Sequence, residues 1–316
     1  MQKTIPVFLL SLSLASCINV KSDDGSIGDI FTGKKGNGQM TEKVFSGDFN
    51  SIEVSTSIHA DIVKSDVERV VISAPSDILE FVKVEQNGEN VRIYVDSDYR
   101  NPISTERVKA IIYAKDFDEL RANSSASVKV KDTFMQDKLK VDVSSSADVD
   151  GHLEANQLDI SVGSSGSFSG KVWADYARFE VSSSGDFSVD GKVQHGSIHA
   201  SSSGDFNGRN LEVKEGEFHA SSSASISAMV SQKASAQASS SGDVNLKKLG
   251  NPVISSSESS SGSVNIPILL NRKSNSVLSC FFIFLIFVLI QNFLPTSRSA
   301  TSAKTSATTE TSKSTA

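Results

Sequence analysis

Two histidines and a glutamate recur at nearly equal intervals in the middle of the chain, and they form its sharpest candidate site. Glu180, His199 and His219 follow one another at spacings of 19 and 20 residues. Two imidazoles beside a carboxylate could hold a transition metal or titrate near neutral pH. Polar side chains that face one another across strands are also common stabilisers without any other role. We therefore predict a candidate surface binding ladder here and assign no metal to it.

Two aspartates, Asp186 and Asp205, belong to the same candidate ladder. Each directly follows a Ser-Ser-Gly triplet. Carboxylates about 5 Å apart on neighbouring strands could bind calcium or act as an acid–base pair. A solvated turn residue is the simpler interpretation, because serine takes this place after four other triplets, at Ser127, Ser167, Ser225 and Ser263.

Several classes of protein are excluded by what the chain lacks. The sequence has no P-loop, dinucleotide fingerprint, nucleophile elbow or HExxH motif, so no catalytic residue and no cofactor is predicted. Its two cysteines, Cys17 and Cys280, lie in different hydrophobic stretches, which excludes a disulfide scaffold and a cysteine-rich zinc module. A net charge of −6 without clusters of Lys and Arg argues against nucleic acid as a partner.

The residues of the candidate ladder are positioned by an internal repeat. The triplet Ser-Ser-(Ala/Gly) occurs eight times, with successive spacings of 21, 19, 19, 19, 20, 18 and 20 residues. A period this regular indicates a solenoid. The small residues that end the triplets are Ala126, Ala147, Gly166, Gly185, Gly204, Ala224, Gly242 and Gly262.

Apolar residues occupy fixed places in each copy of the repeat. The second residue after the triplet is always apolar, and so are the residues four and six before its small residue in the first seven copies. The residue between those two is mostly polar, and such alternation predicts β-strands. The expected fold class is therefore all-β, a single-stranded parallel β-helix with turns of 18–21 residues over 120–270. Phe168, Phe187 and Phe206 should stack inside it, the first serine of each triplet should point inward, and Glu258 should disturb the last turn.

The region 41–119 is also predicted to be β and to start the solenoid. Residues 91–95 alternate cleanly after a turn-forming segment at 86–90, as in two strands joined by a turn. Residues 49–58 align with 117–126, so we expect a degenerate first copy to begin near Ile52. One short helix is expected within 74–81, capped by Ser76 or Asp77.

The N-terminal end resembles an export signal. Residues 6–14 form a short apolar run after Lys3, and Leu-Ala-Ser-Cys17 follows. The run is too short to span a bilayer. The four residues resemble a bacterial lipobox, which makes Cys17 the predicted lipidation site and 1–17 a lipoprotein signal peptide. An ordinary signal peptide with a chance cysteine is the alternative. Residues 18–40 are polar and read as a flexible tether.

The C-terminal end, 271–316, combines a hydrophobic segment with a low-complexity tail. Only three of the eighteen residues in 277–294 are polar, and at 1.5 Å per residue a helix of this length reaches about 27 Å, barely enough to span a bilayer. Three interpretations stay open, namely a membrane helix, an apolar cap for the fold, and an out-of-frame extension of the gene.

A family resemblance rests on Phe49-Asn50-Ser51-Ile52-Glu53-Val54 and on the later Leu-x-(Ala/Val)-x-Ser-Ser-(Ala/Gly)-x-Val runs. Over about 44–266 the chain resembles the putative auto-transporter adhesin, head GIN domain family. The resemblance implies a β-helical lipoprotein of the Bacteroidetes type with no assigned biochemistry. No functional residue carries over from it, and the segment after Leu270 departs from the family.

These observations favour a non-catalytic binding or structural role at the cell envelope. A lipid anchor would hold the protein on the membrane, in the outer membrane on its surface or periplasmic side. Ladders of Ser, Asp and Asn would suit a glycan or a surface protein as partner. The first alternative is a carbohydrate-active β-helix enzyme, a polysaccharide lyase or hydrolase, because β-helices also host such activities. The second is envelope sensing through the hydrophobic segment 277–294.

Overall fold

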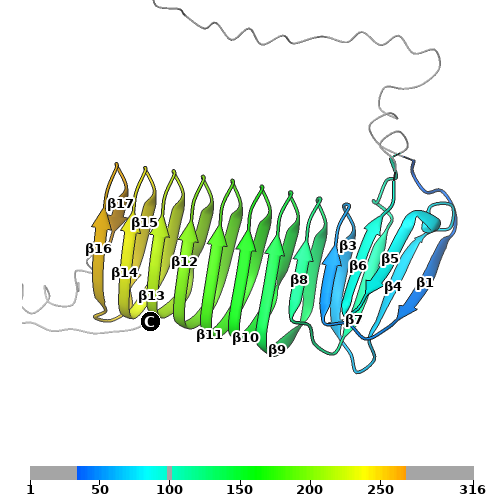
Figure 1. Cartoon of the computed structure of the whole chain (residues 1–316), viewed down its shortest axis with the longest axis horizontal. Helices are drawn as coiled ribbons and strands as arrows, with labels where there is room; N and C mark the ends of the chain where they lie inside the picture. Colours follow the sequence, from blue (N-terminus) through cyan, green and yellow to red (C-terminus); the bar gives the residue numbers. More distant parts are fainter. Residues whose placement is uncertain (1–33, 98–101, 268–316) are drawn as a thin grey trace, which may run out of the picture. The chain divides into compact units, whose positions relative to one another are not determined.

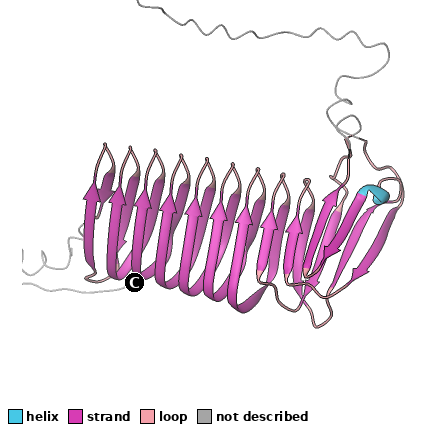
Figure 2. Ribbon diagram, viewed as in Figure 1, coloured by secondary structure: helices cyan, strands magenta, loops and turns pink. Residues whose placement is uncertain are grey.

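The repeat of about 19 residues corresponds to one coil of a parallel β-solenoid (Figure 1). The computed structural model describes residues 34–97 and 102–267, which are almost entirely strands and turns (Figure 2). The predicted fold class is confirmed. Consecutive coils pair in parallel through long strands, which are β9 (Ser127–Val143), β10 (Asp148–Val162), β11 (Ser167–Val181), β12 (Asp186–Ala200), β13 (Asp205–Ala220) and β14 (Ser225–Ala238).

Each long strand consists of two arms that meet at a bend. In β11 the pairing with β12 runs up to Ala174, skips Asp175 and resumes at Tyr176. We call the part before the bend the first arm and the part after it the second arm. Buried and more exposed side chains alternate along both arms, because successive side chains of a strand point to opposite faces.

The core contains the predicted aromatic stack. Phe168 and Phe206 lie on either side of Phe187, with ring centroids 5.0 and 4.9 Å from it. All three side chains are at most 1% exposed. Phe179 joins them from the second arm, 5.1 Å from Phe187. The apolar positions of the repeat therefore form a continuous interior, where each buried phenylalanine contributes about 2–3 kcal/mol.

The prediction that the first serine of each pair points inward is wrong. Ser183 and Ser184 are exposed and have φ angles of 52° and 59°, as at the central positions of a type I′ turn. Gly185 N–H closes this turn by donating to the Ser182 carbonyl, 2.9 Å away. Alternation fails here because it holds only for extended backbone, and a left-handed pair reverses the chain instead. Ser184 N–H also donates to the Ser202 carbonyl of the next coil at 3.1 Å, so successive turns are hydrogen-bonded to one another.

The small residue after each serine pair is required by a close approach to the neighbouring coil. A Cβ atom at Gly204 would lie 2.8 Å from the carbonyl carbon and oxygen of Val181, and one at Gly242 would lie 2.6 Å from those of Ala220. Larger side chains cannot fit where the backbones are this close.

The first coil begins where the degenerate copy was expected. Its strands are β2 (Ser51–Val54) and β3 (His59–Lys64), which pair in parallel with β8 (Glu119–Ala122) and with β9. Ile52 pairs with Leu120, as the alignment of the two segments predicts. Thr56 and Ser57 take the place of the serine pair, with φ angles of 61° and 53°.

A group of strands covers the end of the solenoid, on the side of the first coil that faces away from the repeats (Figure 1). The group consists of β1 (Met40–Ser46), β4 (Arg69–Pro75), β5 (Val82–Asn87), β6 (Asn90–Val95) and β7 (Lys109–Ala114). There β6 and β7 pair in parallel with β2 and β3 of the first coil. β4 pairs antiparallel with β1 and β7, and β5 and β6 form the expected hairpin. The helix expected within 74–81 is only one 3₁₀ turn, η1 (Leu79–Phe81), without a side-chain cap. Asp77 does not cap it, because its carboxylate accepts the N–H groups of Asn37 and Gly38.

The last complete coil is made of β15 (Asp243–Lys248) and β16 (Val253–Glu258), and β17 (Ser263–Asn265) pairs with β15 as the start of the next coil. Glu258 is exposed where the earlier copies bury an apolar residue, and its carboxylate accepts the N–H of Val264 at 2.7 Å.

Cys17, most of the tether and the segment 277–294 lie outside the described residues. Within 34–97 and 102–267, no helix is long and apolar enough to cross a membrane.

Candidate functional site

The histidines of the candidate ladder are adjacent on the outside of the second arms. Glu180 pairs with His199, which in turn pairs with His219. The two imidazole rings stack with centroids 4.8 Å apart and planes only 4° from parallel. The Ser197 hydroxyl lies 3.1 Å from Nε2 of His199. The sequence thus places these three side chains correctly, while a binding role for them stays a prediction.

The electrostatics of this trio favour a neutral imidazole at His199. Burial, and then the neighbouring His219, lower the pKa of His199, since both disfavour a positive charge there. The Glu180 carboxylate is held by the guanidinium of Arg178, whose Nε lies 3.1 Å away. In the part of the chain that the structure describes, no group of three or more His, Cys, Asp or Glu residues is placed to hold a metal ion.

The two aspartates of the candidate ladder lie on another surface. Asp186 pairs with Asp205, as expected, but both stand at the start of the first arm, whereas the histidines are on the second. Both are exposed, and the Ser225 hydroxyl donates to Asp205. The candidate ladder is therefore two separate patches, because the bend in each coil turns the two arms to different sides.

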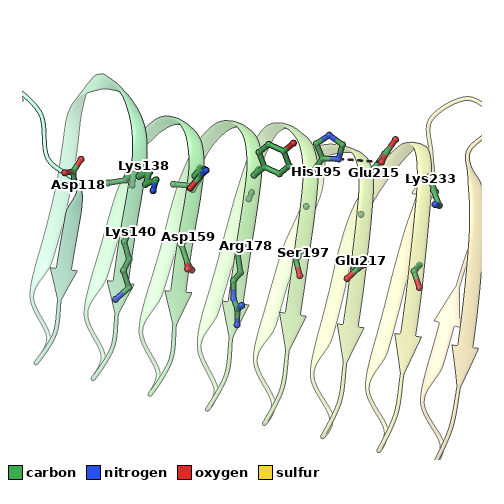
Figure 3. A pocket seen from close by; sticks show the side chains of 18 of the residues that line it. Asp118, Lys138, Lys140, Asp159, Arg178, His195, Ser197, Glu215, Glu217 and Lys233 are labelled. Carbon is green, nitrogen blue, oxygen red and sulfur yellow. Dashed lines mark ion pairs between the residues drawn. The ribbon is translucent and has the colours of Figure 1, made fainter.

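A larger feature of the second arms is a groove of about 1000 Å³ that crosses β9 to β14 (Figure 3). Two rows of outward side chains line it, and each row holds one residue from each coil. The first row is Lys138, Gln157, Tyr176, His195, Glu215 and Lys233. The second row is Lys140, Asp159, Arg178, Ser197, Glu217 and Ser235.

An aromatic pair occupies the middle of the first row. The rings of Tyr176 and His195 are nearly parallel, 17° apart, with centroids separated by 4.9 Å. Tyr176 is 59% exposed, so much of its ring remains open to a ligand. Nδ1 of His195 lies 3.5 Å from a carboxylate oxygen of Glu215 (Figure 3). Neither Tyr176 nor a partner for His195 was identified from the sequence, although all members of this row stand nine residues before the small residue of a triplet.

The second row contains a carboxyl group with an unusual environment. Asp159 lies in register between Lys140 and Arg178, yet each cation binds another carboxylate, Asp142 at 2.9 Å and Glu180 respectively. Burial raises the pKa of Asp159, with the charge of Arg178 working in the opposite direction. A half-buried carboxylate in this position can accept hydrogen bonds from a ligand.

The floor of the groove is the backbone of core-facing residues that lie between the two rows. It passes from Leu139 and Leu158 through Ala177 to Gly196 and Gly216. A Cβ atom at Gly216 would lie 2.6 Å from the ring of Phe218, and one at Gly196 would lie 3.0 Å from Val213. Core side chains thus fill the space beneath the glycines, and the outer surface there is backbone.

Comparison with known proteins gives one family match and several similar structures. The family model described as putative auto-transporter adhesin, head GIN domain, matches residues 48–252. A putative adhesin from Parabacteroides merdae is 16% identical with a TM-score of 0.68, and a putative lipid binding protein from Parabacteroides distasonis is 22% identical with a TM-score of 0.67. The alignments cover 74% of this chain and 99% of each of those chains. At these identities the structures show a shared fold. No curated protein matches the sequence.

Proposed function

Since the chain belongs to the putative auto-transporter adhesin, head GIN domain family, we propose that it is a non-catalytic binding module of the cell envelope and that the groove on its second arms is the binding surface. The observation that carries the proposal is the exposed Tyr176 ring, which lies beside His195 in a groove with charged walls. Aromatic rings combined with a few positioned polar groups are typical of ligand sites.

The arrangement of carboxylates supports binding over hydrolysis. A glycosidase uses two carboxyl groups, one acidic and one free to act as base or nucleophile. Burial raises the pKa of Asp159, as a general acid requires. The two carboxylates whose charges act on it are not free to serve as the second group, because Glu180 is bound by Arg178 and Asp142 by Lys140. In register with Asp159, Glu119 is two strands away, about 10 Å at the usual strand spacing, and is itself bound by Arg121 and Lys140. On the other side the next carboxylate is Glu217, three strands away, which is about 14 Å.

Binding can be tested with the full-length protein in detergent and two immobilised panels, one of glycans and one of envelope or host-surface proteins. We expect one panel to retain the protein and Tyr176→Ala to weaken that binding roughly tenfold, as the loss of one aromatic contact would. Trp173→Ala is the matched control, because Trp173 is also exposed, at 41%, but belongs to the first arm of the same strand. Equal effects of the two variants, or no retention on either panel, would contradict the proposal. Release of products from a polysaccharide, abolished by Asp159→Asn, would replace it with the enzymatic alternative.

We further propose that the module is tethered through a lipid on Cys17, which follows Leu-Ala-Ser in the sequence. Two or more acyl chains would give stable anchoring, whereas one gives only marginal binding. Cells fed an alkyne-labelled fatty acid should incorporate the label into the protein, and Cys17→Ser should abolish labelling and release the protein from the membrane fraction. Equal labelling of both forms would rule out this anchor.

A further inference from the structure

We propose that the ligand of the groove is a linear, uncharged glycan that lies parallel to the solenoid axis. This inference rests on the proposed binding function, and it adds the chemical class of the ligand and its direction. Three properties of the groove support it, namely its periodicity, the pairing of an aromatic ring with a hydrogen-bonding carboxylate, and its balance of charge.

The periodicity of the groove suits a polymer of repeating units. Each row contributes one side chain per coil from β9 to β14, and neighbouring strands are about 4.8 Å apart. Five such steps make a track of about 24 Å. The repeat of an extended pyranose chain is close to one strand step, so successive sugar units would meet successive coils in similar positions.

The central coils offer the two kinds of contact that a sugar ring needs. The exposed ring of Tyr176 can pack against the C–H face of a pyranose. Asp159, in the adjacent row and one strand away, can accept hydrogen bonds from two hydroxyls through its two carboxylate oxygens. Both groups lie on the same outer face as Gln157, which pairs directly with Tyr176.

The charge of the groove favours an uncharged polymer. Its lining includes four basic residues and four acidic ones, so the formal charges cancel. An acidic polysaccharide would therefore meet as much repulsion as attraction along the track. A folded protein partner is also disfavoured, because stable interfaces usually centre on a cluster of apolar anchors, and among the lining residues that the structure describes Tyr176 is the one large apolar side chain that is exposed. The basic residues are Lys138, Lys140, Arg178 and Lys233, and the acidic ones are Asp118, Asp159, Glu215 and Glu217.

Calorimetric titration of the full-length protein tests this inference. The probes are neutral series of cello-, xylo-, chito- and malto-oligosaccharides from disaccharide to octasaccharide, with oligogalacturonides as acidic comparators. At least one neutral series should bind, with an affinity that rises up to about five or six units and then levels off, as a track of five strand steps implies. Tyr176→Ala and Asp159→Asn should each weaken binding roughly tenfold, while Trp173→Ala should not. Unchanged unfolding midpoints would show that the variants are folded.

Three results would overturn the inference. They are the absence of binding by every neutral series, a preference for oligogalacturonides, and an affinity that does not change between disaccharide and octasaccharide. Retention on the protein panel alone that depends on Tyr176 would leave the proposed binding function intact and exclude only a glycan as the ligand. No retention on either panel would contradict the binding function itself.

Discussion

Replacing both turn serines of one coil with glycine should stabilise the protein. Ser183 and Ser184 hold left-handed φ angles of 52° and 59°, a conformation that costs an L-residue roughly 1–2 kcal/mol. Glycine avoids this cost but loses about 0.5–1 kcal/mol more backbone entropy on folding. The difference is about 0.5–1 kcal/mol per position, so Ser183→Gly/Ser184→Gly should raise the free energy of unfolding by about 1–2 kcal/mol.

Urea denaturation followed by circular dichroism measures this change as a shift in midpoint at constant slope. Ser169→Gly is the matched control, because Ser169 is an exposed residue of β11 that is not among those with positive φ. Glycine there should lower the free energy of unfolding by about 0.5–1 kcal/mol. The same exchange should therefore have opposite signs at the turn and in the strand. If the turn variant is also destabilised, the serine hydroxyls must stabilise the coil by more than the strain of its backbone, and the reasoning from φ fails.

Three further outcomes are expected in the same assay. Phe187→Ala should cost about 3–5 kcal/mol, because it empties the centre of the aromatic stack, and Phe187→Leu should cost clearly less; equal losses would contradict this packing. Gly216→Ala should cost about 1–3 kcal/mol, because its Cβ would lie 2.6 Å from the Phe218 ring; a neutral effect would show that the ring can move. The pKa of His199 is lowered in the folded protein, so the unfolded state binds a proton at this residue more readily. The contribution of His199 to the free energy of unfolding should therefore be complete above the unfolded pKa of about 6.5 and decrease as the pH falls below it. The midpoint should therefore be lower at about pH 5 than at about pH 7.5, and His199→Gln should reduce that difference.

The fold could be predicted because two periodicities in the sequence agree. The triplets fix the length of a coil, and the alternation around Phe168 and Phe187 fixes which side chains enter the core. The orientation of the serines could not be obtained by extending that alternation. It depends on φ, and Ser183 leaves the extended region of backbone conformation, so its side chain no longer follows the parity of the strand.

The candidate site was harder to predict, because a groove on a solenoid depends on shape more than on residue type. The row that contains Tyr176 and His195 shares no chemical character, since its members are basic, amide, aromatic and acidic in turn. Position in the repeat aligns them, but nothing in their composition distinguishes a lined groove from an ordinary solvated face. The floor at Gly216 is set by how Phe218 fills the core beneath it, which only the three-dimensional arrangement reveals.

Within β9 to β14, each coil is hydrogen-bonded to the coil before it and the coil after it. Unequal recombination between two copies of the repeat could therefore remove or duplicate one coil, such as 167–185. The remaining neighbouring coils would still be hydrogen-bonded to one another in the same way. The track on the second arms would shorten or lengthen by one strand step each time. Evolution could thus adjust how long a ligand the protein accommodates in whole units, without redesigning the contacts made by any single coil.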